Sequence, residues 1–221
     1  MPRPVPTVGE RDETTRVEAF SDGVFAIAIT LLVLEIRVPE QVVGGAGLAR
    51  ALADLWPSYL AFFTSFATIG IMWVNHHRLF TLIRRCDHWL LVANLCLLLW
   101  VSFLPFPTAV VARSLTGSPQ AARTAALFFS GTFVAVAVAF NLLWRYAAAR
   151  GHLLDESISV ESIRAQTKQY AFGPLWYLAA FALAFVSVPA SLGLNVVLAL
   201  FFALPLRASA DSDPSLARAP R

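Results

Sequence analysis

A polar cluster at the start of a long apolar segment is the feature that most constrains this chain. Residues 16–34 read RVEAFSDGVFAIAITLLVL, with Ser21 and Asp22 near the beginning. The segment has the length of a helix that crosses a membrane. Ionisable side chains in such a helix are unfavourable and by default mark a functional or assembly site. Beyond them the segment is aliphatic with one hydroxyl, that of Thr30.

The composition predicts an all-α integral membrane protein. Hydrophobic residues make up 57% of the 221 residues and charged residues only 14%, whereas soluble domains contain about 25% charged residues. Repeated apolar stretches approach the length that crosses a bilayer. The net charge of +3 comes from basic residues between these stretches, where they determine topology. We therefore expect the lipid bilayer, and not nucleic acid, as a partner.

The apolar stretches divide into six expected transmembrane helices without an internal repeat. We expect a cytoplasmic leader at 1–17, a membrane domain at 18–206 and a disordered cytoplasmic tail at 207–221. A Gly-rich connector and a short amphipathic segment follow the first helix. The expected helices cover residues 18–38, 56–74, 90–111, 121–146, 170–188 and 192–206.

The distribution of basic residues predicts the orientation. An even number of spans places both termini on one side, and 13 of the 17 Arg and Lys residues fall on that side. Positively charged residues are enriched on the cytoplasmic side of membrane proteins. We therefore expect a plasma-membrane protein with both termini in the cytoplasm.

Helical periodicity groups the apolar residues of the first helix on one face. At about 100° per residue, this face is about 100° wide, and Ser21 and Asp22 project away from it. Such a face packs against another helix, contacts lipid or lines an internal path, and periodicity alone favours packing. The face consists of Phe20, Val24, Ile27, Thr30, Leu31 and Leu34.

Asp22 needs a hydrogen-bond partner, because its carboxylate lies about one turn inside the membrane. The second expected helix ends with His76, His77 and Arg78, at the same depth in an antiparallel arrangement. We expect a pair between Asp22 and one of these residues, within or between subunits, that orients the first helix. No metal site is expected, since adjacent histidines point about 100° apart. The two cysteines are expected to be inert thiols.

These residues resemble the transmembrane protein 175 family of potassium channels. The segment RVEAFSDGVFAIAITLLVLEI contains the family's Arg-x-x-x-Phe-Ser-Asp motif as Arg16, Phe20, Ser21 and Asp22. The segments IGIMWVNHHRLF and WVSFLPFPTAV resemble the second and third helices of bacterial members. The resemblance implies a homotetramer of six-helix subunits around a central pore that the first helix lines. It implies no TVGYG-type filter, and this sequence contains none.

The resemblance also implies a role for each residue of the first helix. The narrowest point is at Ile27, selectivity is at Thr30, and further constrictions are at Leu31 and Leu34. These residues coincide with the apolar face of the helix wheel, which favours a pore over packing. The polar network expected to orient the helix consists of Arg16, Phe20, Ser21, Asp22, His76 and His77.

We therefore expect a potassium-selective or potassium-preferring channel. K⁺ and other monovalent cations pass a hydrophobic constriction passively, without a cofactor. The alternative is a proton-coupled or other secondary transporter with Asp22 and the two histidines as a relay. Transporters commonly contain internal repeats and broken helices, and the sequence indicates neither. An enzyme is not expected, because no nucleophile–base pair or phosphate loop occurs in or beside a span.

Overall fold

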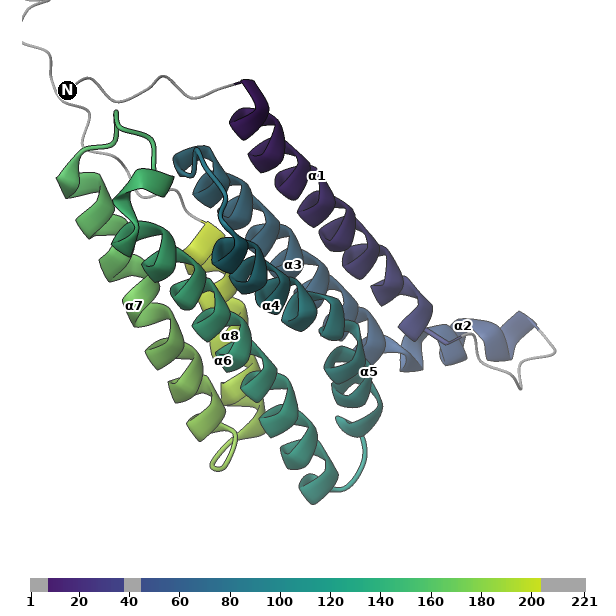
Figure 1. Cartoon of the computed structure of the whole chain (residues 1–221). Helices are drawn as coiled ribbons and strands as arrows, with labels where there is room; N and C mark the ends of the chain where they lie inside the picture. The colour runs from purple at the N-terminus through teal and green to yellow at the C-terminus, as the bar shows by residue number, and fades with distance from the viewer. Residues whose placement is uncertain (1–7, 38–44, 204–221) are drawn as a thin grey trace, which may run out of the picture.

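The computed structural model describes residues 8–37 and 45–203, which fold into an antiparallel helical bundle (Figure 1). Long helices alternate in direction along the chain, and short connections join them. The 3₁₀ turn η1 continues α1, and the 3₁₀ turn η2 follows α6. The elements are α1 (Val8–Leu31), η1 (Leu32–Glu35), α2 (Gly45–Asp54), α3 (Trp56–Leu82), α4 (His88–Phe103), α5 (Pro105–Ser114), α6 (Pro119–Ala149), η2 (Gly151–Leu153), α7 (Val160–Leu183) and α8 (Val188–Ala203).

Four stretches of the described chain are long and apolar enough to cross a membrane. They are Glu13–Glu35, Trp56–Leu82, His88–Ser114 and Pro119–Ala149. The expected fifth and sixth spans exist as helices α7 and α8, but they do not meet the same criteria. The first half of α7 is polar, and the apolar part of α8 is short.

Several helix boundaries differ from the sequence expectation. α1 begins at Val8 and not at residue 18, and α7 covers Val160–Leu183 where residues 170–188 were expected. α3 continues past residue 74 to Leu82, because His76, Leu79 and Phe80 keep one face of its last turns buried. α7 and α8 are joined by residues 184–187, and Pro189 lies inside the first turn of α8. Proline is tolerated in a first turn, where its missing N–H has no helical acceptor. The expected tail at 207–221 lies outside the described residues.

The expected third span is divided into α4 and α5 at Leu104. Pro105 and Pro107 occupy the first turn of α5 and lack the N–H groups that would continue the ladder of α4. The hydroxyl of Thr108 donates to the carbonyl of Leu104 at 2.8 Å. It also shares a buried 2.8 Å hydrogen bond with the hydroxyl of Ser65 on α3. The hydrogen bond between Ser65 and Thr108 therefore joins α3 to α5 directly after the break.

α7 contains an internal proline whose cost is offset by α6. Pro174 has no N–H to donate to the carbonyl of Tyr170, one turn earlier. The side-chain amide of Asn141 on α6 donates to this carbonyl at 2.7 Å. In a lipid environment an unpaired carbonyl is especially unfavourable, so this contact fixes α7 against α6.

The connections α3–α4 and α6–α7 meet at one end of the bundle, which we call the basic end. The backbone N–H of Arg84 donates to Leu153 O at 2.8 Å, and its guanidinium contacts the carboxylate of Asp155 at 2.8 Å. Hydrogen bonds from the backbone and hydroxyl of Ser157, together with Arg84, hold the pKa of Asp155 below its ordinary value. This carboxylate therefore remains ionised at neutral pH and ties the two connections together.

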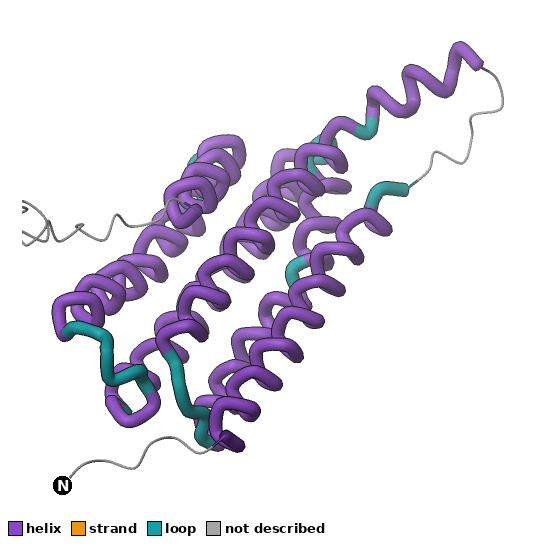
Figure 2. Tube along the Cα trace, turned by 90° about the horizontal axis from the view of Figure 1, so that it is seen from above, coloured by secondary structure: helices purple, strands orange, loops and turns teal. Residues whose placement is uncertain are grey.

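α1 lies at the edge of the bundle in both views (Figures 1 and 2). It packs mainly against α3 and α4, whereas α7 lies on the far side. At the end opposite the basic end, the carboxylate of Glu35 accepts a 3.1 Å hydrogen bond from Arg113 on α5. One side of α1 is therefore held by the bundle and the other is left uncovered.

Candidate functional site

α1 has one buried face and one exposed face. The buried face includes Phe25, which is 1% exposed, while Ile27 is 60%, Leu31 42% and Leu34 71% exposed. Residues three and four apart lie on the same side of a helix, so the exposed residues form a continuous face. The described helices of the protomer do not cover it, so of the alternatives raised by periodicity, packing inside the protomer's own bundle does not apply. We call it the exposed stripe, and it consists of Phe20, Ile27, Thr30, Leu31 and Leu34.

Thr30 contributes an oxygen to the exposed stripe. Its hydroxyl donates to the carbonyl of Ile27 at 2.9 Å, and the residue is exposed. This bond uses the hydroxyl proton, whereas the oxygen retains lone pairs that accept hydrogen bonds or coordinate a cation. Thr30 is thus a polar residue within an otherwise apolar stripe.

A chain of hydrogen bonds connects the buried face of α1 with α4 and α3. The hydroxyl of Ser21 donates to Val17 O at 2.8 Å, and Nδ2 of Asn94 donates to Ser21 Oγ at 2.9 Å. Oδ1 of Asn94 lies 2.9 Å from Nε2 of His76. Because an amide oxygen can only accept, His76 carries a proton on Nε2. Ser21 and His76 are fully buried, so these bonds join three helices in the interior.

His76 is enclosed by aromatic rings. The centroid of its imidazole lies 5.3 Å from that of Phe25 and 4.4 Å from that of Phe80. Its Nδ1 atom is buried without a hydrogen-bond partner among the described residues. A second N–H at this atom would lack an acceptor. The geometry therefore suits a neutral imidazole that donates to Asn94.

The expected pair between Asp22 and a histidine or arginine is not formed within the described residues. Oδ1 of Asp22 instead accepts a 2.8 Å hydrogen bond from the indole Nε1 of Trp73. Nδ1 of His77 contacts Oε1 of Glu18 at 2.6 Å. Glu18 and Asp22 are one turn apart on α1, as are Trp73 and His77 on α3. The antiparallel helices therefore place the two pairs side by side, and this register decides the partners.

The first-helix motif divides between the two faces. Ser21 and Asp22 bond to neighbouring helices, whereas Arg16 and Phe20 are exposed. Arg16 and Phe20 border a crevice between α1 and α4 toward the basic end. Their role in orienting the helix stays a prediction, whereas Ser21 and Asp22 make the hydrogen bonds that such a role requires.

The cysteines do not form a reactive pair. Cys86 lies in the α3–α4 connection, Cys96 lies in α4, and both are free. Burial raises the pKa of the Cys86 thiol, which lowers its reactivity at neutral pH. Within residues 8–37 and 45–203, no cluster of three or more His, Cys, Asp and Glu side chains is placed to hold a metal ion.

Known proteins resemble this chain over most of its length. The sequence model of a family described as "Endosomal/lysosomal potassium channel TMEM175" matches residues 16–105. A potassium channel of Chamaesiphon minutus is 56% identical over 196 residues, covering 88% of this chain and 96% of that protein. The chain belongs to the TMEM175 family.

Two further comparisons agree with this family, one by sequence and one by fold. A potassium channel of Streptomyces collinus is 46% identical over 191 residues, covering 86% of this chain and 92% of that protein. The crystal structure of a lysosomal potassium-selective channel TMEM175 homolog from Chamaesiphon minutus matches with a TM-score of 0.78 and 54% identity. It covers 87% of this chain and 97% of that chain. These descriptions denote ion channels and not enzymes.

Three residues that hydrogen-bond to members of the expected polar network were not predicted from the sequence. Asn94 bridges Ser21 and His76, Trp73 binds Asp22, and Glu18 binds His77. The amide of Asn94 in the apolar run LLVANLCLLLW was a usable signal, because polar residues in membrane helices commonly bond to other helices. Trp73 gave no such signal, since tryptophan near a helix end is typical of a membrane interface.

Proposed function

We propose that this protein is a potassium channel in which K⁺ flows passively through a central pore lined by α1. The relatives described above are potassium channels. The exposed stripe is the observation that supports a pore-lining role for particular residues. It is apolar except for the hydroxyl of Thr30 and points away from the protomer, while hydrogen bonds hold the opposite face of α1.

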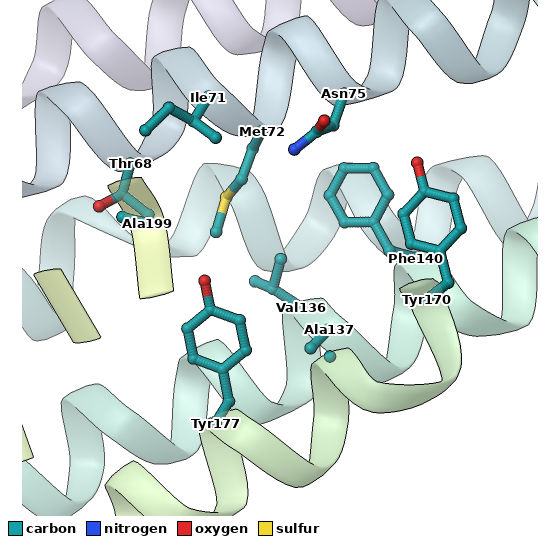
Figure 3. Close-up of a pocket in the computed structure, with 11 residues that line it drawn as sticks. Thr68, Ile71, Met72, Asn75, Val136, Ala137, Phe140, Tyr170, Tyr177 and Ala199 are labelled. Carbon is teal, nitrogen blue, oxygen red and sulfur yellow. The ribbon is translucent and has the colours of Figure 1, made fainter. Parts of the chain in front are cut away.

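The pore requires several subunits, because each protomer has one such stripe at its edge. A cavity inside the bundle, between α3, α6, α7 and α8, has a volume of about 50 Å³. Met72 and Tyr177 point toward each other across it (Figure 3). A space of this size holds at most about three or four water molecules. We therefore place the ion path between protomers, in a homotetramer whose four stripes face the symmetry axis.

The constriction consists of rings of aliphatic side chains. Four Ile27 side chains form the narrowest ring, and Leu31 and Leu34 extend the apolar path. Narrow apolar pores expel water and thereby block ions. Opening requires α1 to rotate or shift so that the Ile27 ring widens. Partly dehydrated K⁺ then passes the hydroxyl oxygens of Thr30, which compensate part of its lost hydration.

The hydrogen bonds to α3 and α4 determine which face of α1 is turned to the axis. A rotation of α1 as an isolated rod would break the bonds of Ser21 to Asn94 and of Asp22 to Trp73. We infer that α1 moves together with its contacts on α3 and α4. Arg16 lies on the side of the stripe toward the basic end, where an unpaired cation would repel K⁺.

In the proposed topology all six long helical segments cross the plasma membrane, with α4 and α5 together forming the third. Both termini then lie in the cytoplasm. The α3–α4 connection with Arg84 and Arg85 and the α6–α7 connection with Arg150 meet at the basic end. This arrangement agrees with the enrichment of positive charge on the cytoplasmic side.

A proton-coupled transporter is the second candidate, and the geometry does not favour it. A relay through Asp22 and the histidines needs a hydrogen-bonded path between them. Asp22 instead bonds to Trp73, and His77 bonds to Glu18. An indole N–H donates but does not accept a proton, so it does not extend a relay from Asp22.

A flux measurement tests the channel function. The purified protein is reconstituted into liposomes with a K⁺ gradient, and subunits are counted by native mass spectrometry. We expect K⁺ flux without a coupling gradient, single-channel steps in planar bilayers and four subunits. Flux that stops when a proton or sodium gradient is removed would support the transporter.

Replacing Asp22 with Ala should lower the yield of tetramer more than it lowers the preference for K⁺ over Na⁺. The change leaves the indole N–H of Trp73 without its acceptor, at a cost of about 1–3 kcal/mol per subunit for a buried group and less where water reaches it. Trp73→Phe should have a similar effect, and the double variant should be little worse than either single variant.

Glu18→Ala is the matched control for Asp22→Ala, because it removes the adjacent carboxylate, whose partner His77 is more exposed. Tetramer yield by size-exclusion chromatography and reversal potentials in K⁺/Na⁺ gradients provide the two readouts. An intact Asp22→Ala tetramer that has lost its ion preference would contradict the division of roles.

A further inference from the structure

A cavity of about 430 Å³ lies between α3, α5, α6 and α8, at the end opposite the basic end. Its walls include Ala61 on α3, Val111 on α5, Phe129 on α6 and Val196 on α8. The volume is in the range of small-molecule binding sites. Three of its four helices belong to stretches long and apolar enough to cross a membrane. The cavity therefore lies within the part of the protein that contacts lipid.

The cavity opens sideways between α3 and α8. On α3, Trp56 is 54% and Leu60 52% exposed. On α8, Gly193 is exposed, and a Cβ atom there would meet no heavy atom within 4 Å. In a bundle inserted in a membrane, the medium beside such an opening is lipid hydrocarbon.

The lining selects for an apolar occupant. Among the described residues that line the cavity there is no ionisable side chain, and the single hydroxyl belongs to Thr64. A polar ligand would lose its hydration there without gaining hydrogen bonds. A peptide segment from a second copy of the chain would likewise bring backbone groups that the lining does not satisfy. A hydrocarbon chain has neither requirement.

The position of Trp56 indicates where the polar end of a bound molecule lies. It is the first residue of α3 and lies at the edge of the cavity. Tryptophan at the end of a membrane helix favours the level of the lipid head groups, because its ring is apolar and its N–H is polar. A molecule that extends from this level into the cavity has a polar head beside Trp56 and an apolar tail next to Gly193.

We propose that this cavity binds one acyl chain of a membrane phospholipid, which enters between α3 and α8 with its head group beside Trp56. The site depends on insertion in the membrane and not on the pore. It is separate from the exposed stripe, which belongs to α1 and η1.

Photolabelling in liposomes tests this proposal. The protein is reconstituted with a phospholipid that carries a diazirine in its acyl chain, and cross-linked peptides are located by mass spectrometry. We expect labelling around Leu60 and Leu192. Gly193→Leu should lower it about tenfold, equivalent to about 1.4 kcal/mol of binding free energy, because its side chain occupies the open space in the cavity.

Gly70→Leu is the matched control, since Gly70 is also a glycine of a membrane helix with open space at its Cβ but does not line the cavity. Its labelling should equal that of the wild type. Val196→Phe fills the same cavity and replaces Gly193→Leu if that variant does not fold. Labelling that persists in the filled variants, or falls equally in Gly70→Leu, would overturn the proposal. Cross-links from this cavity to a second subunit would do the same.

Discussion

Replacing Ile27 with Asn is expected to raise K⁺ flux about tenfold, which corresponds to a barrier lower by about 1.4 kcal/mol. In the proposed tetramer a ring of isoleucines excludes water from the constriction, whereas a ring of amides would admit it. Ile27 is 60% exposed in the protomer and belongs to no buried core. The change should therefore alter the pore without unfolding the subunit.

Leu178→Asn is the control for Ile27→Asn. It introduces the same amide at an exposed apolar position of α7, on the far side of the bundle from α1. Flux through it should equal that of the wild type in the same liposomes, after correction for the amount of tetramer. If a folded Ile27→Asn tetramer conducts like the wild type, then Ile27 is not the constriction.

Replacing Asn94 with Ala is expected to have the largest effect on the position of α1. The change removes the donor to Ser21 and the acceptor from His76 in one step. His76 would then have both ring nitrogens buried without partners. Each unsatisfied buried group costs about 1–3 kcal/mol, although measured hydrogen bonds between membrane helices average only about 0.6 kcal/mol. We expect lower thermal stability together with altered flux.

Asn141→Ala separates these two effects. It removes a half-buried amide that also bridges two helices, but this amide joins α6 to α7 and not α1 to its neighbours. We expect it to reduce stability while flux per tetramer is preserved. A double-mutant cycle with Ser21→Ala should give a coupling energy clearly different from zero. Additive effects of Ser21→Ala and Asn94→Ala would show that the bond between them does not hold the helix.

The stripe on α1 was predictable because a regular helix relates sequence spacing directly to direction. The wheel places Ile27, Leu31 and Leu34 together and Ser21 elsewhere, and the structure exposes the first three and buries the last. The wheel does not show which face meets the bundle. That choice depends on Asn94 and His76, which lie far along the chain from Ser21.

Within one protomer, the partner of Asp22 differs from those expected from the sequence. Charge suggested His76, His77 or Arg78, because an ionised carboxylate favours a cationic donor. The antiparallel register of α1 and α3 instead places Trp73 beside Asp22 and Glu18 beside His77. A shift of α3 by one turn would bring His77 beside Asp22 in place of Trp73, and nothing in the local sequence specifies which register forms.

Local sequence patterns were enough to predict membrane helices, a gathering of positive charge at one end and an apolar face with one threonine on the first helix. Hydropathy and helical periodicity are properties of one segment, and they do not depend on which helices pack against it. Only the tertiary structure decided which face of α1 is covered, which donors reach Ser21 and Asp22, and where a cavity remains between α3 and α8. These features depend on the register and spacing of helices far apart in the chain, which packing and buried hydrogen bonds select together.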